Sequence, residues 1–298
     1  MTAKQSSDPV LDWNSRVLPP PAANAGMMTV DVEDYFQVEA FFSHVDRKDW
    51  DSHECRVERN TDRILDMFQA SGTKATFFTL AWIAKRYPHM LRRIADAGHE
   101  VASHGVEHRR ADSQNRAEFL EDLKSSKALL EDISGKQVKG YRAASFSVTR
   151  KNLWALETIA EAGYKYSSSI YPVHHDLYGI PEAPRFAFHP FASSNFLEVP
   201  VTSFKLGKVN LPCGGGGYFR LLPYWWSVFQ LRQIQKTSAG PCMFYFHPWE
   251  IDPDQPRISG TSLKTRIRHY TNLSAMQARL EKLLKEFEWQ RVDAVYPV

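Results

Sequence analysis

The sequence predicts a soluble α/β protein whose parallel strands close into a barrel. Short apolar runs rich in β-branched residues alternate along the chain with segments of helical periodicity. Polar residues directly follow several of these predicted strands. That placement is typical of barrels, where the active site lies at the carboxyl ends of the strands. No internal repeat or linker divides the chain, so we expect one folded domain over residues 27–298.

The alternation can be followed from the first predicted strand to the last predicted helix. Residues 28–32 form a β-branched run containing an acid, and residues 61–69 follow with helical spacing. The other expected strands are 75–80, 99–103, 140–142, 166–169, 196–200 and 242–247. The other expected helices are 87–97, 117–133, 153–162 and 274–287, the last with a well-formed amphipathic stripe. Strands that alternate with helices in this way predict a mainly parallel sheet.

The composition excludes several classes of protein. The chain has a net charge of +3, 24% charged and 43% hydrophobic residues, and no block of Lys and Arg that would indicate a nucleic-acid partner. Its three Cys form neither a metal-binding pair nor a disulfide framework. No apolar run reaches the roughly 18 residues of a membrane span. Residues 1–26 lack the apolar region of a secretory signal and are expected to be a disordered leader, so we expect a cytoplasmic protein.

The strongest chemical signal is a pair of histidines preceded by a group of acids. His104 and His108 are four residues apart, and residues at this spacing lie on one face of a helical turn. Asp31, Glu33 and Asp34 follow the first predicted strand. Catalytic zinc commonly takes three His or carboxylate ligands, so two His and one acid would suffice and another acid would remain as a base. The alternative is that two surface His happen to share this spacing.

Two further strand ends carry ionisable residues. Arg142 ends the 140–142 strand, and His247 ends the 242–247 strand. A metal site, a carboxylate base, a cation and a second imidazole are the groups that metal-assisted hydrolysis requires. His247 follows four apolar residues, however, and could be a histidine of the core, while Asp31 could be a turn or helix-capping residue.

This arrangement resembles the polysaccharide deacetylases, the carbohydrate esterases with the NodB homology domain. The family's acidic, His-x-x-x-His, Arg-containing and Leu-His motifs correspond to residues 30–34, 104–108, 141–144 and 246–247. The resemblance implies a distorted (β/α)₇ barrel, similar to a TIM barrel. It implies Asp31 as general base, Arg142 as the residue that orients it and His247 as general acid. The metal, Zn²⁺ or another divalent ion such as Co²⁺ or Ni²⁺, would be held by His104, His108 and an acid, Glu33 or Asp34.

More narrowly, the chain resembles a subgroup associated with bacterial exopolysaccharide and exosortase loci. The segments that carry this resemblance are DVEDYFQVEAF, GYRAASFSVT, GGGGYFRLLPYW and FYFHPWEIDPDQPR, followed by the carboxyl-terminal helix. The implied activity is removal of N-acetyl groups from N-acetylhexosamine units of a bacterial polysaccharide. The implied partners are an N-acetylated poly- or oligosaccharide and the inner face of the inner membrane, through peripheral association.

Several features depart from the family pattern or leave alternatives open. Val32 separates the acids of the first motif, Gly105 replaces the usual Ser or Thr, and either Glu198 or Glu250 could tune His247. The glycine run 214–217 predicts a hinge or a place where a sugar approaches the backbone. The aromatic residues at 218–226 could stack on sugars, lie at a membrane surface or pack in the core. The alternatives in function are an allantoinase-like hydrolase of a cyclic amide or ureide, and a carbohydrate-binding relative without catalysis.

Overall fold

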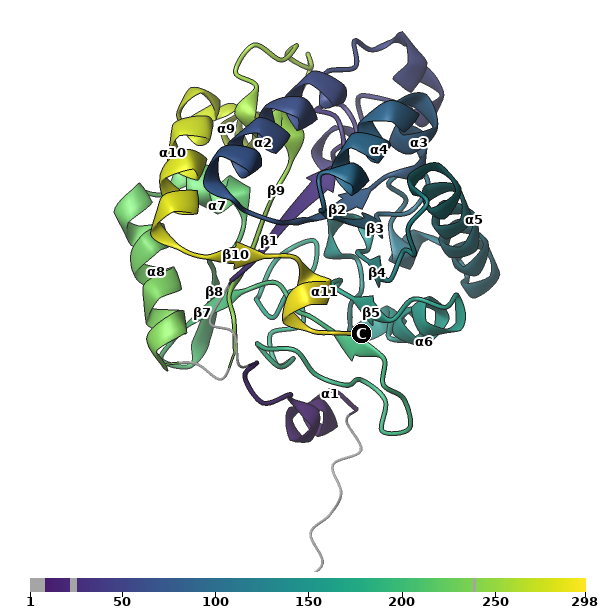
Figure 1. Ribbon diagram of the computed structural model, residues 1–298, viewed down its shortest axis with the longest axis vertical. Helices are drawn as coiled ribbons and strands as arrows, with labels where there is room; N and C mark the ends of the chain where they lie inside the picture. The colour runs from purple at the N-terminus through teal and green to yellow at the C-terminus, as the bar shows by residue number, and fades with distance from the viewer. Residues whose placement is uncertain (1–8, 22–25, 238–239) are drawn as a thin grey trace, which may run out of the picture.

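The computed structural model describes residues 9–21, 26–237 and 240–298, and its centre is a curved parallel sheet surrounded by helices (Figure 1). The sheet contains eight strands: β1 (Gly26–Val32), β2 (Thr76–Thr79), β3 (Glu100–Ser103), β4 (Gly140–Tyr141), β5 (Tyr166–Ser167), β6 (Leu197–Glu198), β9 (Met243–Phe246) and β10 (Trp289–Gln290). Neighbours run in the order β10-β1-β2-β3-β4-β5-β6, and β9 also pairs with β1. All of these pairings are parallel, as the alternation predicts.

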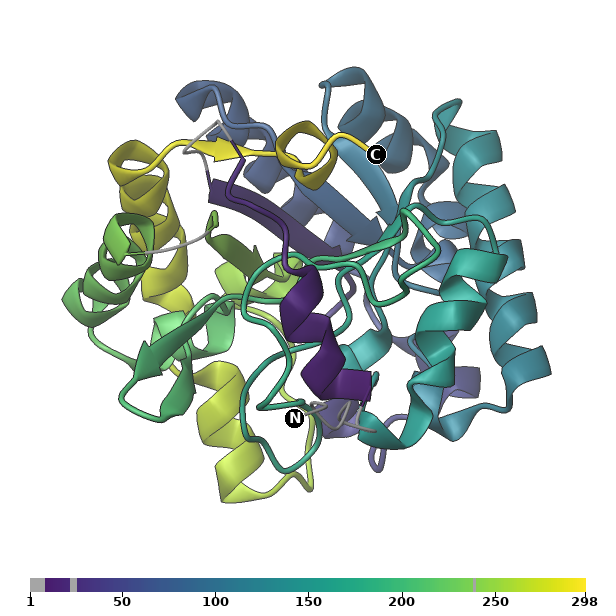
Figure 2. The ribbon, with the colours of Figure 1, turned by 90° about the horizontal axis from the view of Figure 1, so that it is seen from below.

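Most of the longer helices cover the outer side of this sheet (Figures 1 and 2). The longer helices are α2 (Val57–Ser71), α4 (Pro88–Asp96), α5 (Arg116–Ser134), α6 (Trp154–Glu161), α8 (Tyr224–Thr237), α9 (Leu263–Tyr270) and α10 (Leu273–Glu286). The short ones are α1 (Pro9–Asp12), α3 (Ala81–Arg86), α7 (Gly216–Leu221) and α11 (Val292–Val295). Each predicted strand and helix overlaps one of these elements. The fold is thus the distorted (β/α) barrel that the sequence predicts.

The central strands are buried on both faces, which explains why they have continuous apolar sequences. Every residue of β1, β2, β3 and β9 is buried. On the outer face, Val30 and Phe77 join the main core with side chains of α2, α4 and α5. This packing holds the strand ends rigidly, and the polar residues that follow them therefore have fixed positions.

Residues 9–21 differ from the expected disordered leader. They form α1 and a 3₁₀ turn (Trp13–Arg16), and Trp13 is buried against Phe188, with 5.0 Å between the ring centroids. The Trp13 Nε1–H also donates a hydrogen bond to the carbonyl oxygen of Pro190 (3.1 Å). One large aromatic side chain thus attaches a segment whose composition is otherwise typical of disorder. The rest of the predicted leader lies outside the described residues.

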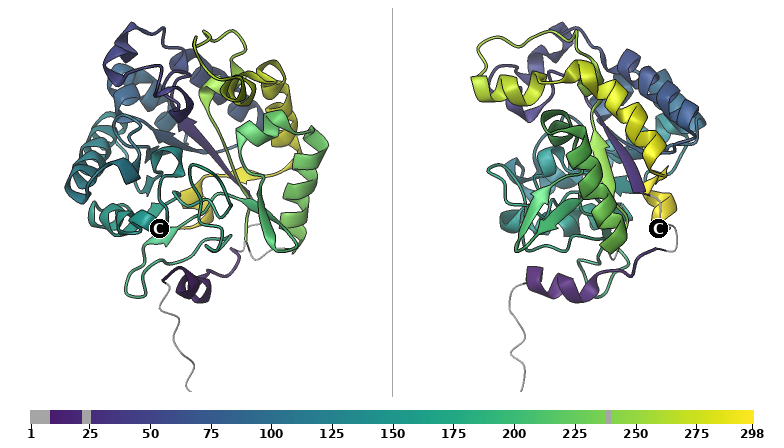
Figure 3. Two further views of the ribbon diagram at one scale, coloured as in Figure 1. Left: turned by 180° about the vertical axis from the view of Figure 1, so that it is seen from behind. Right: turned by 90° about the vertical axis from the view of Figure 1, so that its left-hand side faces the viewer.

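A small antiparallel hairpin lies outside the barrel and was not predicted. Strands β7 (Ser203–Leu206) and β8 (Val209–Pro212) form a separate two-stranded sheet, which lies beside α8 (Figure 3, right). No helix in the described part of the chain is both long enough and apolar enough to cross a membrane.

Candidate metal and acid–base site

The polar residues that follow β1, β3 and β9 meet in one cleft at the carboxyl ends of these strands. The cleft has a volume of about 480 Å³. Five of the sequence-predicted site residues line it: Asp31, Glu33, His104, His108 and His247. Its walls come from the loops after β4, from α7 and from α9. The position agrees with the rule that active sites of barrels lie at this end.

Glu33, His104 and His108 form a buried group of metal-ligand type. One donor atom from each of them lies within 4.8 Å of the others, and no second such group occurs in the described ranges. The His108 Nε2 lies 2.9 Å from Glu33 Oε2. The His104 Nδ1–H donates to the carbonyl oxygen of Arg142 (2.8 Å), which leaves Nε2 free as a ligand. His174, His175 and Asp176, which form a second His/Asp cluster in the sequence, do not form such a group.

The two histidines are brought together by a loop rather than by the helical turn expected from their spacing. The chain leaves β3 at Ser103, and Gly105 and His108 both have positive φ (83° and 51°). A Cβ at Gly105 would lie 2.8 Å from Asp122 Oδ2, so a side chain here would be both strained and crowded. This close approach explains the departure from Ser or Thr at this position. The ring centroids of His104 and His108 are 5.1 Å apart.

The electrostatics of this group fit a divalent cation. Burial would raise the pKa of Glu33, but the nearby His108 and His247 lower it to about 2, so the carboxylate is anionic. Burial lowers the pKa of His104 to about 4, so its imidazole is neutral, the form that binds metals. His108 Nδ1 is buried without a hydrogen-bond partner. Buried polar atoms seldom remain unpartnered, and the donor set suits zinc.

The structure separates the two acids that the sequence left as alternative ligands. Glu33 points into the cleft, whereas Asp34 is fully buried on the other side of the chain and lies outside the metal group. The Asp34 Oδ2 accepts the backbone N–H of Arg56 (2.6 Å) and Val57 (2.9 Å), where α2 begins. The Asp34 Oδ1 accepts the N–H of Tyr35 (2.9 Å). Asp34 is therefore a capping residue, which strand alternation after Asp31 and Glu33 also indicates.

Asp31 and Arg142 form a fully buried ion pair. The Arg142 Nη1 donates to Asp31 Oδ1 (2.5 Å) and to Thr29 Oγ1 (3.0 Å), while Nε and Nη2 donate to the carbonyl oxygen and hydroxyl of Ser168 (3.2 and 3.0 Å). The guanidinium carbon lies 4.0 Å from the ring centroid of Phe78. With so many contacts, Arg142 fixes one carboxylate oxygen of Asp31 and leaves the other available to the cleft.

His247 is held in a chain of charges along one wall of the cleft. Its Nδ1 lies 2.6 Å from Glu250 Oε1, and Glu250 Oε2 accepts a hydrogen bond from Arg220 Nε (2.8 Å). The His247 Nε2 faces Glu33 Oε1 (3.5 Å) and Asp31 Oδ2 (4.0 Å). Burial opposes protonation of His247, but Glu33, Glu250 and Asp31 outweigh it and raise its pKa to about 9. The imidazole is therefore cationic at neutral pH.

Of the two acids considered as partners of His247, only Glu250 contacts it. Glu198 instead accepts the backbone N–H of Ser169 and Ile170 (2.8 Å each) at the end of β5. Burial raises the pKa of Glu198 to about 6, although these hydrogen bonds oppose the shift. Its role is to bind the backbone between two short strands.

Comparison with known proteins identifies the fold and two matched regions. Residues 49–167 match the family model described as "Polysaccharide deacetylase", and residues 168–297 match one described as "Domain of unknown function (DUF3473)". Residues 49–167 are therefore a polysaccharide deacetylase domain, followed by a region of the second type. Its acidic motif precedes the first matched region, the two histidines and Arg142 lie within it, and His247 lies in the second region.

Curated deacetylases and a solved allantoinase structure resemble different lengths of this chain. A peptidoglycan-N-acetylglucosamine deacetylase of Bacillus cereus is 30% identical over 98 residues, which are 33% of this chain and 36% of the relative. A peptidoglycan deacetylase of Helicobacter pylori is 28% identical over 114 residues, 38% of this chain and 37% of the relative. These matches span little more than a third of the relatives. The crystal structure of Puue Allantoinase covers 98% of this chain and 96% of its own, with a TM-score of 0.60 and 15% identity. That similarity confirms the barrel fold.

Several residues that support the site carried no clear sequence signal. Trp249 stacks on His247 with 5.1 Å between the centroids and an interplanar angle of 18°. Its Nε1–H donates to Glu33 Oε1 (3.3 Å). Arg220 reaches Glu250 across 30 residues of sequence, so only the folded chain reveals the pair. Ser145 and Phe146, which line the cleft, both have positive φ (53° and 49°), a strain that the apolar packing around Phe146 maintains.

The glycine run is a close-packed segment and not a hinge. A Cβ at Gly214 would lie 2.3 Å from the carbonyl oxygen of Met243, one at Gly215 would lie 2.7 Å from the ring of Tyr245, and one at Gly216 would lie 2.5 Å from both carboxylate oxygens of Glu250. A Cβ at Gly217, which lines the cleft, would meet nothing within 4 Å. Three of the four glycines thus let α7 approach β9 and the 247–250 segment.

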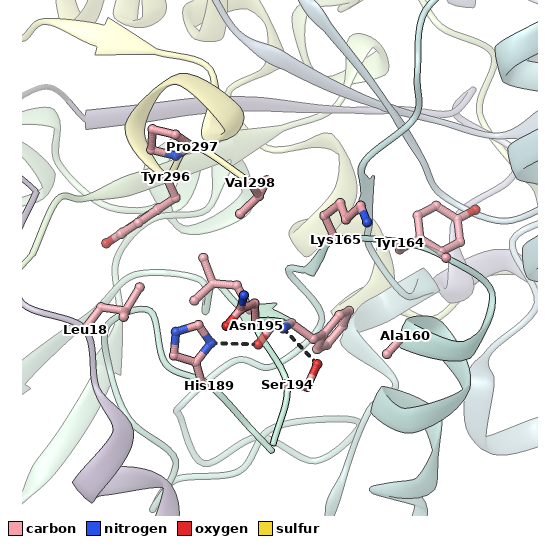
Figure 4. Close-up of a pocket in the computed structure, with 13 residues that line it drawn as sticks. Leu18, Ala160, Tyr164, Lys165, His189, Ser194, Asn195, Tyr296, Pro297 and Val298 are labelled. Atoms are coloured by element: carbon pink, nitrogen blue, oxygen red, sulfur yellow. Dashed lines mark hydrogen bonds between the residues drawn. The ribbon is translucent and has the colours of Figure 1, made fainter. Parts of the chain in front are cut away.

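A second cavity, of about 760 Å³, lies at the opposite, amino end of β5 and β6 (Figure 4). Among the described residues that line it are Lys165 and His189, and none is Asp, Glu or Cys. The Nδ1–H of His189 donates to the carbonyl oxygen of Phe196 (3.0 Å). The described lining of this cavity therefore holds no acid–base pair and no group of metal-ligand type, in contrast to the cleft at the carboxyl end.

Proposed function

We propose that the protein is a metal-dependent N-deacetylase that acts on N-acetylhexosamine units of a bacterial polysaccharide during exopolysaccharide biosynthesis. One observation carries this proposal. The same cleft is lined by a buried carboxylate that an arginine holds in place, by three residues that could bind a metal, and by a cationic imidazole. Hydrolysis of an acetamide needs a base for water, charge stabilisation for the carbonyl oxygen and an acid for the leaving amine.

Glu33, His104 and His108 would hold the metal, which we propose to be Zn²⁺. Their donor atoms are close and buried, and the anionic Glu33 and neutral His104 are in the protonation states that bind cations. A divalent ion there would supply Lewis acidity, which polarises a carbonyl and lowers the pKa of water. Trp249, which donates to one oxygen of Glu33, keeps that carboxylate turned toward the two imidazoles.

Asp31 and His247 would move the protons. The Asp31 Oδ2 is the oxygen that Arg142 does not contact, and it would take a proton from the attacking water. His247 carries its proton at neutral pH and turns Nε2 toward the two acids, so it would donate that proton to the departing amine. Glu250, fixed by Arg220, orients the imidazole through Nδ1 and maintains its positive charge.

Two other functions make different use of the same cleft. An allantoinase-like hydrolase would open a cyclic amide or ureide, and the similarity to Puue Allantoinase is one of fold. A carbohydrate-binding relative would have no use for a base fixed by arginine and an imidazole kept cationic by Glu250. We favour deacetylation because the matched first region and the curated relatives carry that name.

The test is release of acetate from N-acetylglucosamine oligomers by protein purified in the presence of zinc. We expect activity that is lost with a chelator and restored by zinc, and a loss of at least about 10³-fold in kcat for Asp31→Asn. Asp96→Asn, at the exposed end of α4, serves as the matched control and should retain full activity. Activity that persists after complete metal removal, or hydrolysis of allantoin without acetate release, would refute the proposal.

A further inference from the structure

One face of the molecule exposes an unusual concentration of apolar side chains. Eight large hydrophobic residues are exposed in the described part of the chain, and five of them lie on the β7–β8 hairpin, the end of α7 and α8. We call this the hairpin–α8 surface; it consists of Leu206, Val209, Leu221, Trp225 and Phe229. Trp225 is 67% exposed, and Leu206 and Val209 are each 56% exposed. Such grouped exposure is typical of an interaction surface.

The hairpin and α8 are packed into one unit. Phe204 of β7 lies against α8, with 6.3 Å between its ring centroid and that of Trp226 and 6.2 Å to that of Phe229. Leu206 has the same strand parity as Phe204 and is paired with Val209 across the hairpin, so all three lie on the face turned toward α8. The hairpin and α8 lie side by side in Figures 1 and 3. The tip is therefore held beside the exposed aromatic rings.

The outward stripe of α8 changes from aromatic to basic along the helix. Trp225, Phe229, Arg232 and Lys236 follow one another at spacings of four, three and four residues, and all are exposed. Residues at this spacing share one face of a helix. An aromatic end followed by basic residues on one face is characteristic of helices that lie at a membrane surface.

The segment that carries this surface has charged residues of a single sign. Residues 199–249 contain five Lys or Arg and no Asp or Glu. Lys205 and Lys208 are exposed on the hairpin, next to its apolar tip. One acid, Glu286 of α10, contacts the stripe, and it forms an ion pair with Arg232 (2.8 Å). Two copies of this surface placed face to face would repel, whereas an anionic partner would be attracted.

We propose that the hairpin–α8 surface docks the protein on an anionic lipid bilayer. Leu206, Val209, Trp225 and Phe229 would enter the headgroup region, and Lys205, Lys208 and Lys236 would contact acidic headgroups. Trp rings favour this interface because they are apolar with one polar N–H. Burial of a small apolar area or contact of a few lysines with headgroups does not by itself attach a protein stably to a bilayer, but the two contributions together do.

The docking surface is continuous with one wall of the catalytic cleft. Helix α7 contributes Gly217 and Arg220 to the lining of the cleft, and the same helix ends at Leu221 in the hairpin–α8 surface. A docked molecule would thus hold its cleft beside the bilayer. This step rests on the proposed function: the substrates would be N-acetylated saccharides presented at a membrane, such as lipid-linked chains.

The experiment is co-sedimentation of the purified full chain with vesicles of phosphatidylcholine alone or with 30% phosphatidylglycerol. We expect binding to the anionic vesicles that weakens with salt, about tenfold or more weaker binding for Trp225→Ser/Phe229→Ser, and about fivefold weaker binding for each Lys removed in Lys205→Gln/Lys208→Gln. Leu263→Ser/Ile267→Ser removes two equally exposed apolar residues from α9 and should bind as the parent protein does.

Each other outcome overturns the proposal. Absence of binding to anionic vesicles, equal binding to neutral vesicles, or equal losses in the α9 variant would exclude this surface as an anionic-lipid site. A parent protein that elutes as a dimer, with monomeric Trp225→Ser/Phe229→Ser, would assign the surface to self-association. Acetate release from soluble oligomers should be unchanged in the hairpin variant, so failure of docking and failure of the proposed catalysis are measured separately.

Discussion

A single methyl group at Gly216 should disturb the charge chain behind His247. The Cβ of Gly216→Ala would lie 2.5 Å from both oxygens of Glu250 and 2.7 Å from its carboxyl carbon, roughly 1 Å closer than ordinary contact. Glu250 cannot simply move away, because Arg220 Nε (2.8 Å) and His247 Nδ1 (2.6 Å) hold it from two sides. Both Glu250 and Arg220 are about 1% exposed, so no solvent is available to replace a broken bond.

The expected loss of stability can be derived from the contacts that the new methyl group would disrupt. Displacing Glu250 breaks or lengthens at least one hydrogen bond between charged groups, which contributes about 1.5–3 kcal/mol. Inserting a methyl group into a packed core costs about 1–3 kcal/mol, part of which is the same displacement. We therefore expect Gly216→Ala to lower the free energy of unfolding by about 3 kcal/mol. For a chain of this size that corresponds to a fall in Tm of roughly 5 °C.

The assay is thermal and urea unfolding of Gly216→Ala beside Gly217→Ala. The neighbouring glycine also lies in α7, but a Cβ there meets nothing within 4 Å, so Gly217→Ala should be neutral or slightly stabilising through its helix propensity. Gly216→Ala should in addition lower kcat for acetate release, because His247 loses its fixed partner. If the two variants unfold within about 0.5 kcal/mol of each other, the close contact between α7 and Glu250 is refuted.

The other predictions concern the metal group, a buried acid and the amino-terminal segment. Glu33→Gln should abolish stoichiometric zinc binding, measured by mass spectrometry of metals. Asp34→Asn should retain the zinc, but its free energy of unfolding should fall by about 1–2 kcal/mol because the cap of α2 weakens. Zinc loss in Asp34→Asn alone would show that Asp34, and not Glu33, is the ligand. Burial raises the pKa of Glu198 from 4.5 to about 6, so the folded protein binds this proton more tightly than the unfolded chain. The free energy of unfolding should therefore fall by about 2 kcal/mol as the pH rises from about 4 to 7. Urea unfolding of Glu198→Gln should lack this component, and parallel pH curves for the two proteins would contradict it. Trp13→Ala should lower stability by about 2–4 kcal/mol, and an unchanged Tm would show that residues 9–21 do not dock in solution.

The sequence predicted the strands and the polar strand ends because both depend on local patterns. Buried parallel strands are continuous apolar runs, as in residues 242–247. Amphipathic helices are recognisable by the regular spacing of their apolar residues, as in residues 274–287. The carboxyl ends of such strands necessarily share one edge of the sheet. Local pattern and this rule of parallel sheets are therefore sufficient to predict that Asp31, His104 and His247 lie in one cleft.

Other parts of the site depend on contacts that local patterns do not contain. The spacing of His104 and His108 indicated a helical turn, yet the crowding of Gly105 by Asp122 and the positive φ of both Gly105 and His108 make it a loop. Which of Glu33 and Asp34 faces the cleft depends on the position of α2, because the first N–H groups of that helix donate hydrogen bonds to the carboxylate of Asp34. Trp13 docks on residues near 188–190, so its contact is invisible in a segment of disorder-like composition.

The distribution of the site along the chain explains why neither matched region contains the whole machinery. The carboxylates of Asp31 and Glu33 precede residue 49, the two imidazoles and Arg142 lie in 49–167, and His247 lies in 168–297. They converge because β1 pairs with β2 on one side and with β9 on the other, which places the first strand of the barrel between the two regions. Residues 168–297 also supply Glu250, Arg220 and the hairpin that carries Lys205 and Lys208. The second region therefore completes the candidate site and, through α7, joins it to the surface that we propose binds lipid.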